Sequence, residues 1–344
     1  TASDRTAAKT ESDVKSQLGL VAVAMSGGVD SSVAALLLRE QGYEVMGVTM
    51  RLWAEPAMHT TSSEVPVESA RLVCTALGIS HLVVDLRAAF KTEVVDYFTE
   101  TYARGLTPNP CVVCNQRIKF GQLLAYVLAQ GADFMATGHY VRSEQRDGQY
   151  RLLKAADVRK DQSYFLYRLT QTELAHLLFP LGEYTKADVR ELASQRGLPV
   201  AARPESQETC FIADKDYRRF LQVYRPDSIR PGPIVDRRGR ALGEHKGLPF
   251  YTIGQRSGLG IAAPEPLFVL AIAPEQNALV VGPASELGQS ELLASEVTYI
   301  AGHPPSGPLP ITAKIRYRAR HAEAILKPLD HDSAQVSFSE ALRD

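Results

Sequence analysis

The stretch Gly19–Gly42, GLVAVAMSGGVDSSVAALLLREQG, predicts a strand, a glycine-rich turn and a helix in direct succession. Leu20–Met25 is a short apolar run rich in Val and Ala, as in a strand buried on both faces. The run ends at Ser-Gly-Gly, after which apolar residues recur along one face of a helix. Because Tyr43–Met50 is apolar again, the pattern predicts a βαβ unit.

The glycine pair between this strand and helix indicates an anion site. Glycines let backbone N–H groups approach an anion, and a helix N-terminus adds unpaired donors and the positive end of its dipole. The Walker pattern is absent because no Lys follows the last glycine, and the GxGxxG pattern is absent too. The remaining motif, SGGVDSS over residues 26–32, places Asp30 where it can hold a magnesium ion beside phosphates.

This motif resembles the pyrophosphatase loop of enzymes that transfer AMP from ATP to a carbonyl oxygen and release pyrophosphate. The alternative is a glycine-rich turn of an ordinary α/β domain. The complete seven-residue match favours nucleotide binding.

Length and composition bound the remaining possibilities. The 344 residues predict two or three domains, and 45% hydrophobic with 22% charged residues is typical of a soluble globular protein. No apolar run approaches the ~20 residues of a membrane span, so we expect no membrane partner. Residues 1–18 are mostly polar and lack the apolar core of a signal peptide, which predicts a disordered tail and a cytoplasmic protein. The net charge of −1 requires any RNA partner to bind a local basic surface.

Three folded domains are expected after this tail. Strands alternate with helices over residues 19–162, which predicts an α/β domain, a doubly wound parallel sheet with its ligand at the carboxyl ends of the strands near Gly27, Pro110 and Gly138. Residues 163–225 predict a small helical domain without strands. Residues 226–344 contain frequent Gly and Pro between short strand-like runs, which predicts a β-barrel or a pair of barrels.

The four cysteines, Cys74, Cys111, Cys114 and Cys210, are too few for a disulfide scaffold and favour reactive thiols in the cytosol. Cys111 and Cys114 form a CxxC pair in a segment expected to be a loop, because two prolines spaced by two do not fit inside a helix. CxxC alone fits half a zinc site, a redox pair, an iron–sulfur ligand pair or a catalytic thiol, but the sequence lacks a second CxxC or an HxxxH to complete a zinc site. Cys74 fits a small buried helix residue, whereas Cys210 follows a polar run typical of an accessible loop.

Seven segments in this order resemble the tRNA 2-thiouridylase family, which makes 2-thiouridine at the wobble position. They are the loop motif, TPNPCVVCNQRIKFG, ATGHY, KDQSYFL, LFPLGEYTK, SQETCFI and HKGLPFYTIGQRSGLGI. The resemblance covers about residues 19–320 and implies an ATP domain, a central helical domain and a C-terminal β-barrel.

The resemblance also implies the chemistry. O2 of the uridine at position 34 would be adenylated, and sulfur from a cysteine persulfide would then replace AMP at C2. Cys114 matches the catalytic nucleophile and Cys210 the cysteine that carries the persulfide. Thiolate character controls both sulfur steps, and a disulfide between the two cysteines is expected during turnover.

Further sites are implied residue by residue. The implied ATP-binding residues are Ala24, Met25, Ser26, Gly27, Gly28, Val29, Asp30, Ser31, Met50 and Gly138. The residues implied to contact the target base or tRNA are Asn109, Pro110, Cys111, His139, Lys160, Asp161, Gln162, Arg316 and Tyr317. The implied cofactors are ATP and Mg²⁺, with an iron–sulfur cluster as a less favoured alternative. The implied partners are the tRNAs for Lys, Glu and Gln, and a cysteine desulfurase or sulfur-relay protein as sulfur donor.

Four cations alternate in the run AKIRYRARH: Lys314, Arg316, Arg318 and Arg320. If this run is a strand, period-two alternation places all four on one face, where they would meet RNA phosphates. The alternative is a charged edge strand that resists aggregation.

Two departures from the family pattern are visible. Some members carry Asp in place of Cys111, so a role in proton transfer stays unassigned here. The family also continues beyond VSFSEALRD with a Pro-Gly-Gln segment, and we expect a truncated or divergent end to the barrel. Two other functions remain open: another synthetase with a pyrophosphatase loop, and an RNA-binding protein with a degenerate ATP site.

Overall fold

Five parallel strands form the N-terminal sheet of this computed structural model, in the order β3-β2-β1-β4-β7. The strands are β1 (Leu20–Ala24), β2 (Glu44–Arg51), β3 (Ser80–Asp85), β4 (Phe134–Ala136) and β7 (Leu177–Leu178). The structure describes residues 18–55, 64–204 and 209–342, so the expected tail lies outside the described residues except for Leu18. The described part contains no helix with the length and apolar character needed to span a membrane.

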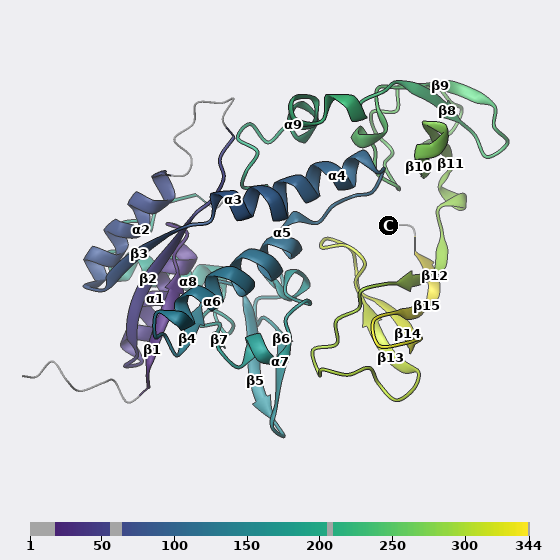
Figure 1. Cartoon of the computed structure of the whole chain (residues 1–344). Coiled ribbons are helices and arrows are strands. Elements are labelled where there is room, and N and C mark those ends of the chain that lie inside the picture. The colour runs from purple at the N-terminus through teal and green to yellow at the C-terminus, as the bar shows by residue number, and fades with distance from the viewer. Residues whose placement is uncertain (1–17, 56–63, 205–208, 343–344) are drawn as a thin grey trace, which may run out of the picture.

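Helices cover both faces of this sheet (Figure 1). Val21 and Val23 of β1 pack in one core cluster with residues of α1 (Val29–Glu40), α2 (Glu64–Leu77) and α8 (Lys186–Gln195). Alternation along the strand sends Ala22 to the opposite face, where two long helices pack. The first consists of α3 (Arg87–Phe90), η2 (Lys91–Asp96) and α4 (Tyr97–Ala103), and the second of α5 (Pro110–Val113), η3 (Cys114–Leu123) and α6 (Leu124–Ala129).

The sheet extends further along the chain than expected. β7 pairs with β4, and α8 packs against α1, so the expectation that strands stop after residue 162 is wrong. Segment 170–178, TQTELAHLL, is predicted to be helical because Thr170 could cap it, but α7 spans only Gln171–Leu174 and β7 follows at Leu177–Leu178. Residues 163–200 therefore share the sheet and the core of residues 19–162.

The CxxC segment is helical where a loop was expected. Pro110 occupies the first turn of α5, where a residue needs no backbone N–H, and the Asn109 side chain accepts a hydrogen bond from the N–H of Val112 at 3.4 Å. The helix continues without a break as the π-helix η3. Cys111 and Cys114 are therefore held on a rigid element.

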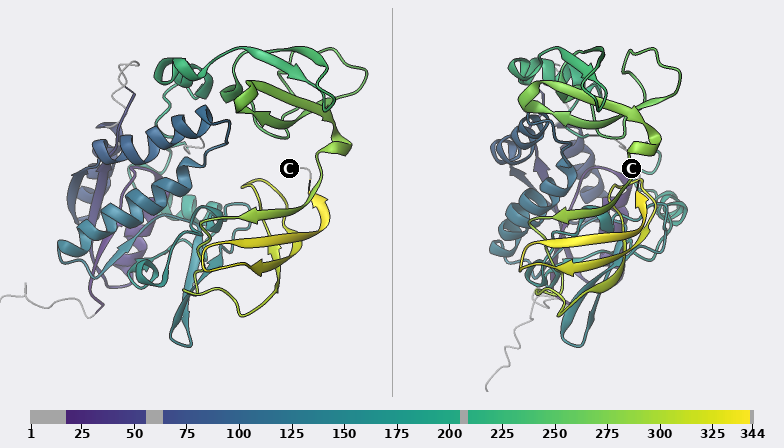
Figure 2. Two further views of the ribbon diagram at one scale, coloured as in Figure 1. Left: turned by 45° about the vertical axis from the view of Figure 1, so that its right-hand side comes forward. Right: turned by 90° about the vertical axis from the view of Figure 1, so that its right-hand side faces the viewer.

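A hairpin and two C-terminal sheets complete the described fold (Figures 1 and 2). The unexpected hairpin pairs β5 (Val141–Arg146) with β6 (Gln149–Lys154), and α9 spans Tyr217–Tyr224. The first C-terminal sheet, β10-β11-β8-β9, contains β8 (Gly232–Val235), β9 (Ala241–His245), β10 (Leu267–Ala273) and β11 (Ala278–Pro283). The second, β12-β15-β14-β13, contains β12 (Gln289–Ala294), β13 (Leu309–Ala313), β14 (Ala322–Pro328) and β15 (Ala334–Leu342). The expected all-β C-terminal region is confirmed, as two four-stranded sheets.

Candidate nucleotide-binding and thiol site

The loop between β1 and α1 is closed by its own serines. The N–H of Ser26 donates to Ser31 Oγ at 3.1 Å, and Ser31 Oγ donates to the carbonyl oxygen of Gly28 at 3.3 Å. Gly27 has φ +69°, and a Cβ there would lie 2.6 Å from the carbonyl oxygen of Pro66. Gly28 caps α1, so the loop leads directly into free N–H groups at a helix N-terminus, as a phosphate site requires.

Gly138, just after β4, lies directly against this loop. A Cβ at Gly138 would lie 2.7 Å from the backbone nitrogen of Ser31 and 2.8 Å from the carbonyl carbon of Asp30. Both contacts are with backbone, which a rotamer change cannot relieve. The end of β4 and the first turn of α1 therefore meet at the carboxyl edge of the sheet, where the sequence placed the ligand.

Two cations that sequence reasoning missed contact the loop region. Lys186 Nζ lies 2.6 Å from Asp30 Oδ1, and the Lys186 side chain is only 12% exposed. Arg203 donates from its guanidinium to the carbonyl oxygen of Gly27 at 2.6 Å. Lys186 belongs to LFPLGEYTK, which the family resemblance included without a role. Because 156 residues separate Lys186 from Asp30, only the fold brings them together.

Asp30 fits a magnesium ligand through one of its oxygens. Oδ1 accepts hydrogen bonds from Lys186 and from the Tyr140 hydroxyl at 2.8 Å. Oδ2 has no hydrogen-bond donor among the described residues, and the side chain is 35% exposed. One carboxylate with phosphate oxygens and water is a common environment for Mg²⁺.

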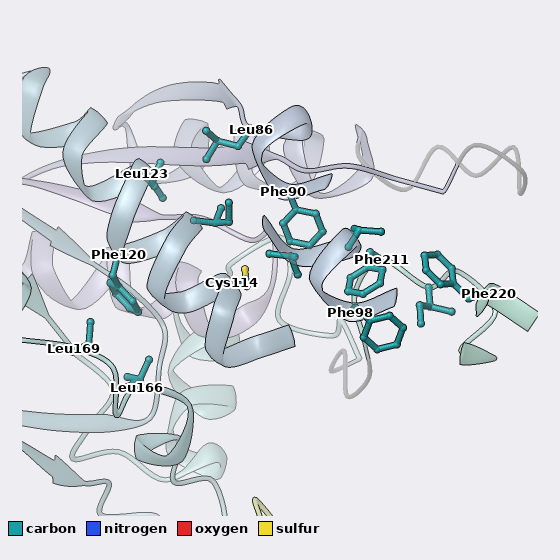
Figure 3. Close-up of a cluster of buried hydrophobic side chains, with 14 of the residues drawn as sticks. Leu86, Phe90, Phe98, Cys114, Phe120, Leu123, Leu166, Leu169, Phe211 and Phe220 are labelled. Atoms are coloured by element: carbon teal, nitrogen blue, oxygen red, sulfur yellow. The ribbon is translucent and has the colours of Figure 1, made fainter. Parts of the chain in front are cut away.

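Three cysteines belong to segments on the face of the sheet opposite α1, where Cys114 shares a core cluster with Phe211, the neighbour of Cys210. Cys114 is buried with the apolar side chains of the two long helices (Figure 3). Cys111, one turn earlier, and Cys210 are exposed, and none of the three forms a disulfide. Part of the SQETCFI segment lies outside the described residues, but Phe211 packs against Phe90, with ring centroids 5.8 Å apart, so Cys210 is anchored on its C-terminal side.

Protein atoms packed around the sulfur atoms make these thiols reluctant to ionise, although Cys111 and Cys210 as whole residues are exposed. Desolvation raises the pKa of Cys111 and Cys114, and it raises the pKa of Cys210 to about 12, with the two other thiols adding to the effect. The positive charge of Lys119 opposes the rise at all three positions. The three sulfur atoms do not all lie within 4.8 Å of one another, so they form no ready site for a single metal ion.

His139 connects the loop to the thiols. It follows Gly138 directly, and its ring lies 5.8 Å from the ring of Phe120 on η3. Its Nδ1 is 2.8 Å from Thr137 Oγ1. Desolvation and the charge of Lys119 hold the pKa of His139 well below its usual range, so the imidazole is neutral at physiological pH.

The Lys160–Gln162 segment is a tightly bonded turn. Asp161 Oδ1 accepts from the N–H of Ala155 at 2.9 Å, and Gln162 Oε1 accepts from the N–H of Tyr140 at 3.0 Å. Both side chains are thus engaged with backbone groups. These hydrogen bonds indicate that the side chains of Asp161 and Gln162 hold the turn in shape, which leaves them less able to contact a partner directly.

The AKIRYRARH run is a connection, and its prediction as a strand is wrong. β13 ends at Ala313, which pairs with Ala322, so the intervening residues must turn the chain back. Arg316, Arg318 and Arg320 are nevertheless accessible at the surface, each at least partly exposed. We call residues 314–320 the basic turn.

The basic turn packs against the segment that follows Lys160–Gln162. Tyr317 lies 4.5 Å from Phe165 between ring centroids, and Lys314 Nζ lies 5.2 Å from the centroid of the Tyr317 ring. Arg316 donates to the carbonyl oxygen of Ile253 at 3.0 Å. The basic turn therefore contacts Tyr164 and Phe165, about 150 residues earlier, which closely follow the Lys160–Gln162 segment that the family resemblance linked to tRNA.

Comparison with known proteins identifies the family. A family described as the tRNA methyl transferase HUP domain matches residues 19–214, and one described as the tRNA methyl transferase PRC-barrel domain matches residues 218–283. The tRNA-specific 2-thiouridylase MnmA of Moorella thermoacetica is 51% identical over 328 residues, covering 93% of this chain and 92% of that protein. The chain belongs to the tRNA-specific 2-thiouridylase family.

Other relatives agree on the 2-thiouridylase name. The MnmA of Carboxydothermus hydrogenoformans is 48% identical over 332 residues, covering 94% of this chain and 91% of that protein. Among solved structures, the U34-tRNA thiolase NcsA of Methanococcus maripaludis aligns with a TM-score of 0.38 at 21% identity over 62% of this chain and 69% of that chain, a likeness too weak to carry an argument. The 2-thiouridylase name and the methyl transferase descriptions differ in the group transferred, and a thiol cluster beside a nucleotide loop suits sulfur.

The contact at Gly138 generates a prediction. Gly138→Ala should lower ATP affinity at least about tenfold, or 1.4 kcal/mol, because the methyl group must push the first turn of α1 away from the phosphates. Isothermal titration with a non-hydrolysable ATP analogue measures this loss. Gly307→Ala is the matched control, since a Cβ at Gly307 meets nothing within 4 Å. Equal affinities in both variants would contradict the placement of the nucleotide.

Proposed function

We propose that this chain catalyses ATP-dependent 2-thiolation of the uridine at position 34 of tRNA. The observation that carries the proposal is the continuity of the site: Gly138 touches the nucleotide loop, and the next residue, His139, packs against the helix that holds Cys114. A base bound beside His139 would thus have the nucleotide loop, with its ATP, on one side and the cysteines on the other.

The first step proposed is adenylation of the base. O2 of uracil attacks the α-phosphorus of ATP, the bond to the bridging oxygen of the β-phosphate breaks, and pyrophosphate leaves as N3 gives up its proton to solvent. The loop N–H groups and the helix N-terminus would hold the pyrophosphate. Lys186 and a magnesium ion on Asp30 would neutralise its charge, in place of the absent Walker lysine.

The second step proposed is sulfur transfer. The terminal sulfur of a Cys210 persulfide attacks C2, and AMP leaves with the C2–O2 bonding electrons. The Cys114 thiolate then attacks the inner sulfur, so a Cys114–Cys210 disulfide forms and the sulfur on C2 leaves with its electron pair. N3 regains a proton as 2-thiouridine forms, and a dithiol reductant must restore the two thiols.

The proposed tRNA contacts lie around this centre. The helix that carries Cys114 begins with Asn109, Pro110 and Cys111, so a flipped base would lie against the N-terminus of α5. The basic turn and the aromatic pair Phe165 and Tyr317 offer charge and stacking surfaces for the surrounding nucleotides. The tRNAs for Lys, Glu and Gln, and a cysteine desulfurase or relay protein as donor, are the partners we propose.

Substitution of the two cysteines tests the order of events. Cys210→Ser should lose protein-bound persulfide and thiolation yet keep tRNA-dependent release of pyrophosphate. Cys114→Ser should still load sulfur on Cys210 but fail to release 2-thiouridine. Mass spectrometry of the Cys210 peptide and nucleoside analysis of the tRNA measure both, and Cys74→Ser is the matched control because burial raises the pKa of that thiol to about 11.

The iron–sulfur alternative predicts a different outcome. If Cys111, Cys114 and Cys210 held a cluster, each substitution would bleach the same chromophore after anaerobic purification. Stoichiometric iron with no persulfide on Cys210 would therefore overturn the proposed sulfur route.

The basic turn generates a prediction about salt. If its arginines neutralise phosphates, the logarithm of tRNA affinity should fall with the logarithm of salt concentration by roughly 0.7–0.9 per contact. Replacing Arg316, Arg318 and Arg320 by Gln should flatten that slope without changing ATP affinity. The control is Arg71→Gln, which removes an exposed cation from α2, a helix that packs on the N-terminal sheet. A slope unchanged by the triple substitution would assign tRNA binding elsewhere.

A further inference from the structure

A cavity of about 270 Å³ lies beside the helix that carries Cys114, and the proposed chemistry gives it no role. Four of its lining residues are spaced so that they share one face of this helix: Asn109, Val112, Val113 and Gln116. Cys111 and Cys114 do not line the cavity, because their positions fall on the other side of the helix. The helix therefore has the cysteines on one face and the cavity on the other.

The far wall of the cavity comes from two segments that the fold brings to this helix. Arg168 donates from Nε to Gln116 Oε1 at 3.2 Å and from Nη1 to the carbonyl oxygen of Glu296 at 2.7 Å. It also donates from Nη2 to Glu296 Oε2 at 3.1 Å. One guanidinium thus joins the helix face to the connection between β12 and β13, and the cavity lies at this junction.

The backbone at Glu296 is strained. Its φ of +52° lies in the left-handed region, which residues other than glycine rarely adopt. In this conformation both the carbonyl oxygen and the carboxylate of Glu296 contact Arg168. Strain of this kind is concentrated at binding and active sites, where the surrounding structure holds it in place. The strained residue is therefore a second observation, separate from the cavity itself, that points to a ligand site.

The polar groups that line the cavity can still bind a ligand. Because Gln116 Oε1 accepts from Arg168, the NH₂ group of the Gln116 amide is left as a donor. Oε1 of Glu296 has no hydrogen-bond donor within the described chain, so it is left as an acceptor. Tyr97 and Tyr167 add hydroxyl groups and aromatic rings to the lining. Amide donors, a carboxylate acceptor and aromatic rings are groups that bind an unpaired nucleobase through its edge and its flat face.

The size of the cavity limits the ligand. Pockets for drug-sized ligands span about 300–1,000 Å³, so a cavity of about 270 Å³ suits a single base better than a nucleoside triphosphate. Cations for the phosphates of an RNA strand lie close by, since the basic turn packs on Phe165, three residues before Arg168. These features favour a base of single-stranded RNA over a free metabolite.

We propose that the cavity binds the base of the nucleotide next to the target uridine, and that Gln116 and Glu296 are specificity-determining residues. This assignment rests on the proposed function, because Asn109 belongs both to the cavity lining and to the segment expected to contact the target base. An RNA strand with its target base at the cysteine face would continue past Asn109 into the cavity. The enzyme thereby selects tRNAs by a base that it does not modify.

Binding of altered tRNAs tests this inference without any measurement of thiolation. Unmodified tRNA for Glu is prepared intact and with an abasic site at position 33 or 35, and its affinity for the full chain is measured by fluorescence anisotropy. At one of these two positions, the abasic site should weaken binding to the unsubstituted chain at least about fivefold, because the stacking and hydrogen bonds of that base are lost.

Two variants remove the cavity in different ways. Ser295→Trp fills it from an exposed position and leaves the hydrogen bonds of Arg168 in place, whereas Gln116→Leu removes the amide donor from the helix face. In both, intact tRNA should bind at least about fivefold more weakly, and the same abasic site should weaken binding further by less than about twofold. The matched control is Ser290→Trp, at an exposed position of β12 outside the cavity lining, which should keep the full dependence on the base.

Two results would overturn the inference: an undiminished effect of the abasic site in either folded variant, or equal affinity of the unsubstituted chain for all three tRNAs. Unchanged ATP affinity in each variant establishes that its N-terminal domain is folded. A chain that shows the expected dependence on the flanking base yet forms no 2-thiouridine would refute the proposed function and leave the cavity assignment standing.

Discussion

The close contact between Gly138 and the first turn of α1 fixes the geometry of the whole site. A Cβ at this position would lie 2.7 Å from the nitrogen of Ser31, so the residue must be glycine for the loop to keep its shape. The contact sets the nucleotide loop and the end of β4 at one edge of the sheet. His139 then extends from this edge to Phe120, and so to the helix that carries Cys114. We propose that nucleotide activation and sulfur chemistry share one location, because two consecutive residues join the loop to this helix.

The packing that orders the cysteines also disfavours ionisation of their thiols. Apolar packing holds Cys114 and, through Phe211, one side of Cys210, an ordering that the proposed sulfur transfer would need. The same packing desolvates the thiols and raises the pKa of Cys210 to about 12. Lys186, on a helix that covers the other face of the sheet, lies beside Asp30, where we propose that it neutralises the charge of a leaving pyrophosphate.

The sequence predicted correctly those features of the structure that depend only on neighbouring residues. The loop at Ser26–Ser31 and the position of Gly138 were predictable because turn geometry and strand ends are set by neighbouring residues. Lys186 was missed because its partner lies 156 residues away and only β7 and α8 bring it near. Pro110 was misread because a proline excluded from a helix interior is well suited to its first turn. The basic turn was misread because alternation of cations does not reveal whether hydrogen bonds to a neighbouring strand exist.

The most direct test of the central claim is a single-turnover reaction of the full chain with radiolabelled ATP, unmodified tRNA and a persulfide donor. If one site both adenylates and thiolates the base, AMP and 2-thiouridine at position 34 should appear in equal amounts, and neither should form when tRNA or ATP is omitted. AMP accumulating without 2-thiouridine while Cys210 carries persulfide, or 2-thiouridine formed without ATP, would contradict it.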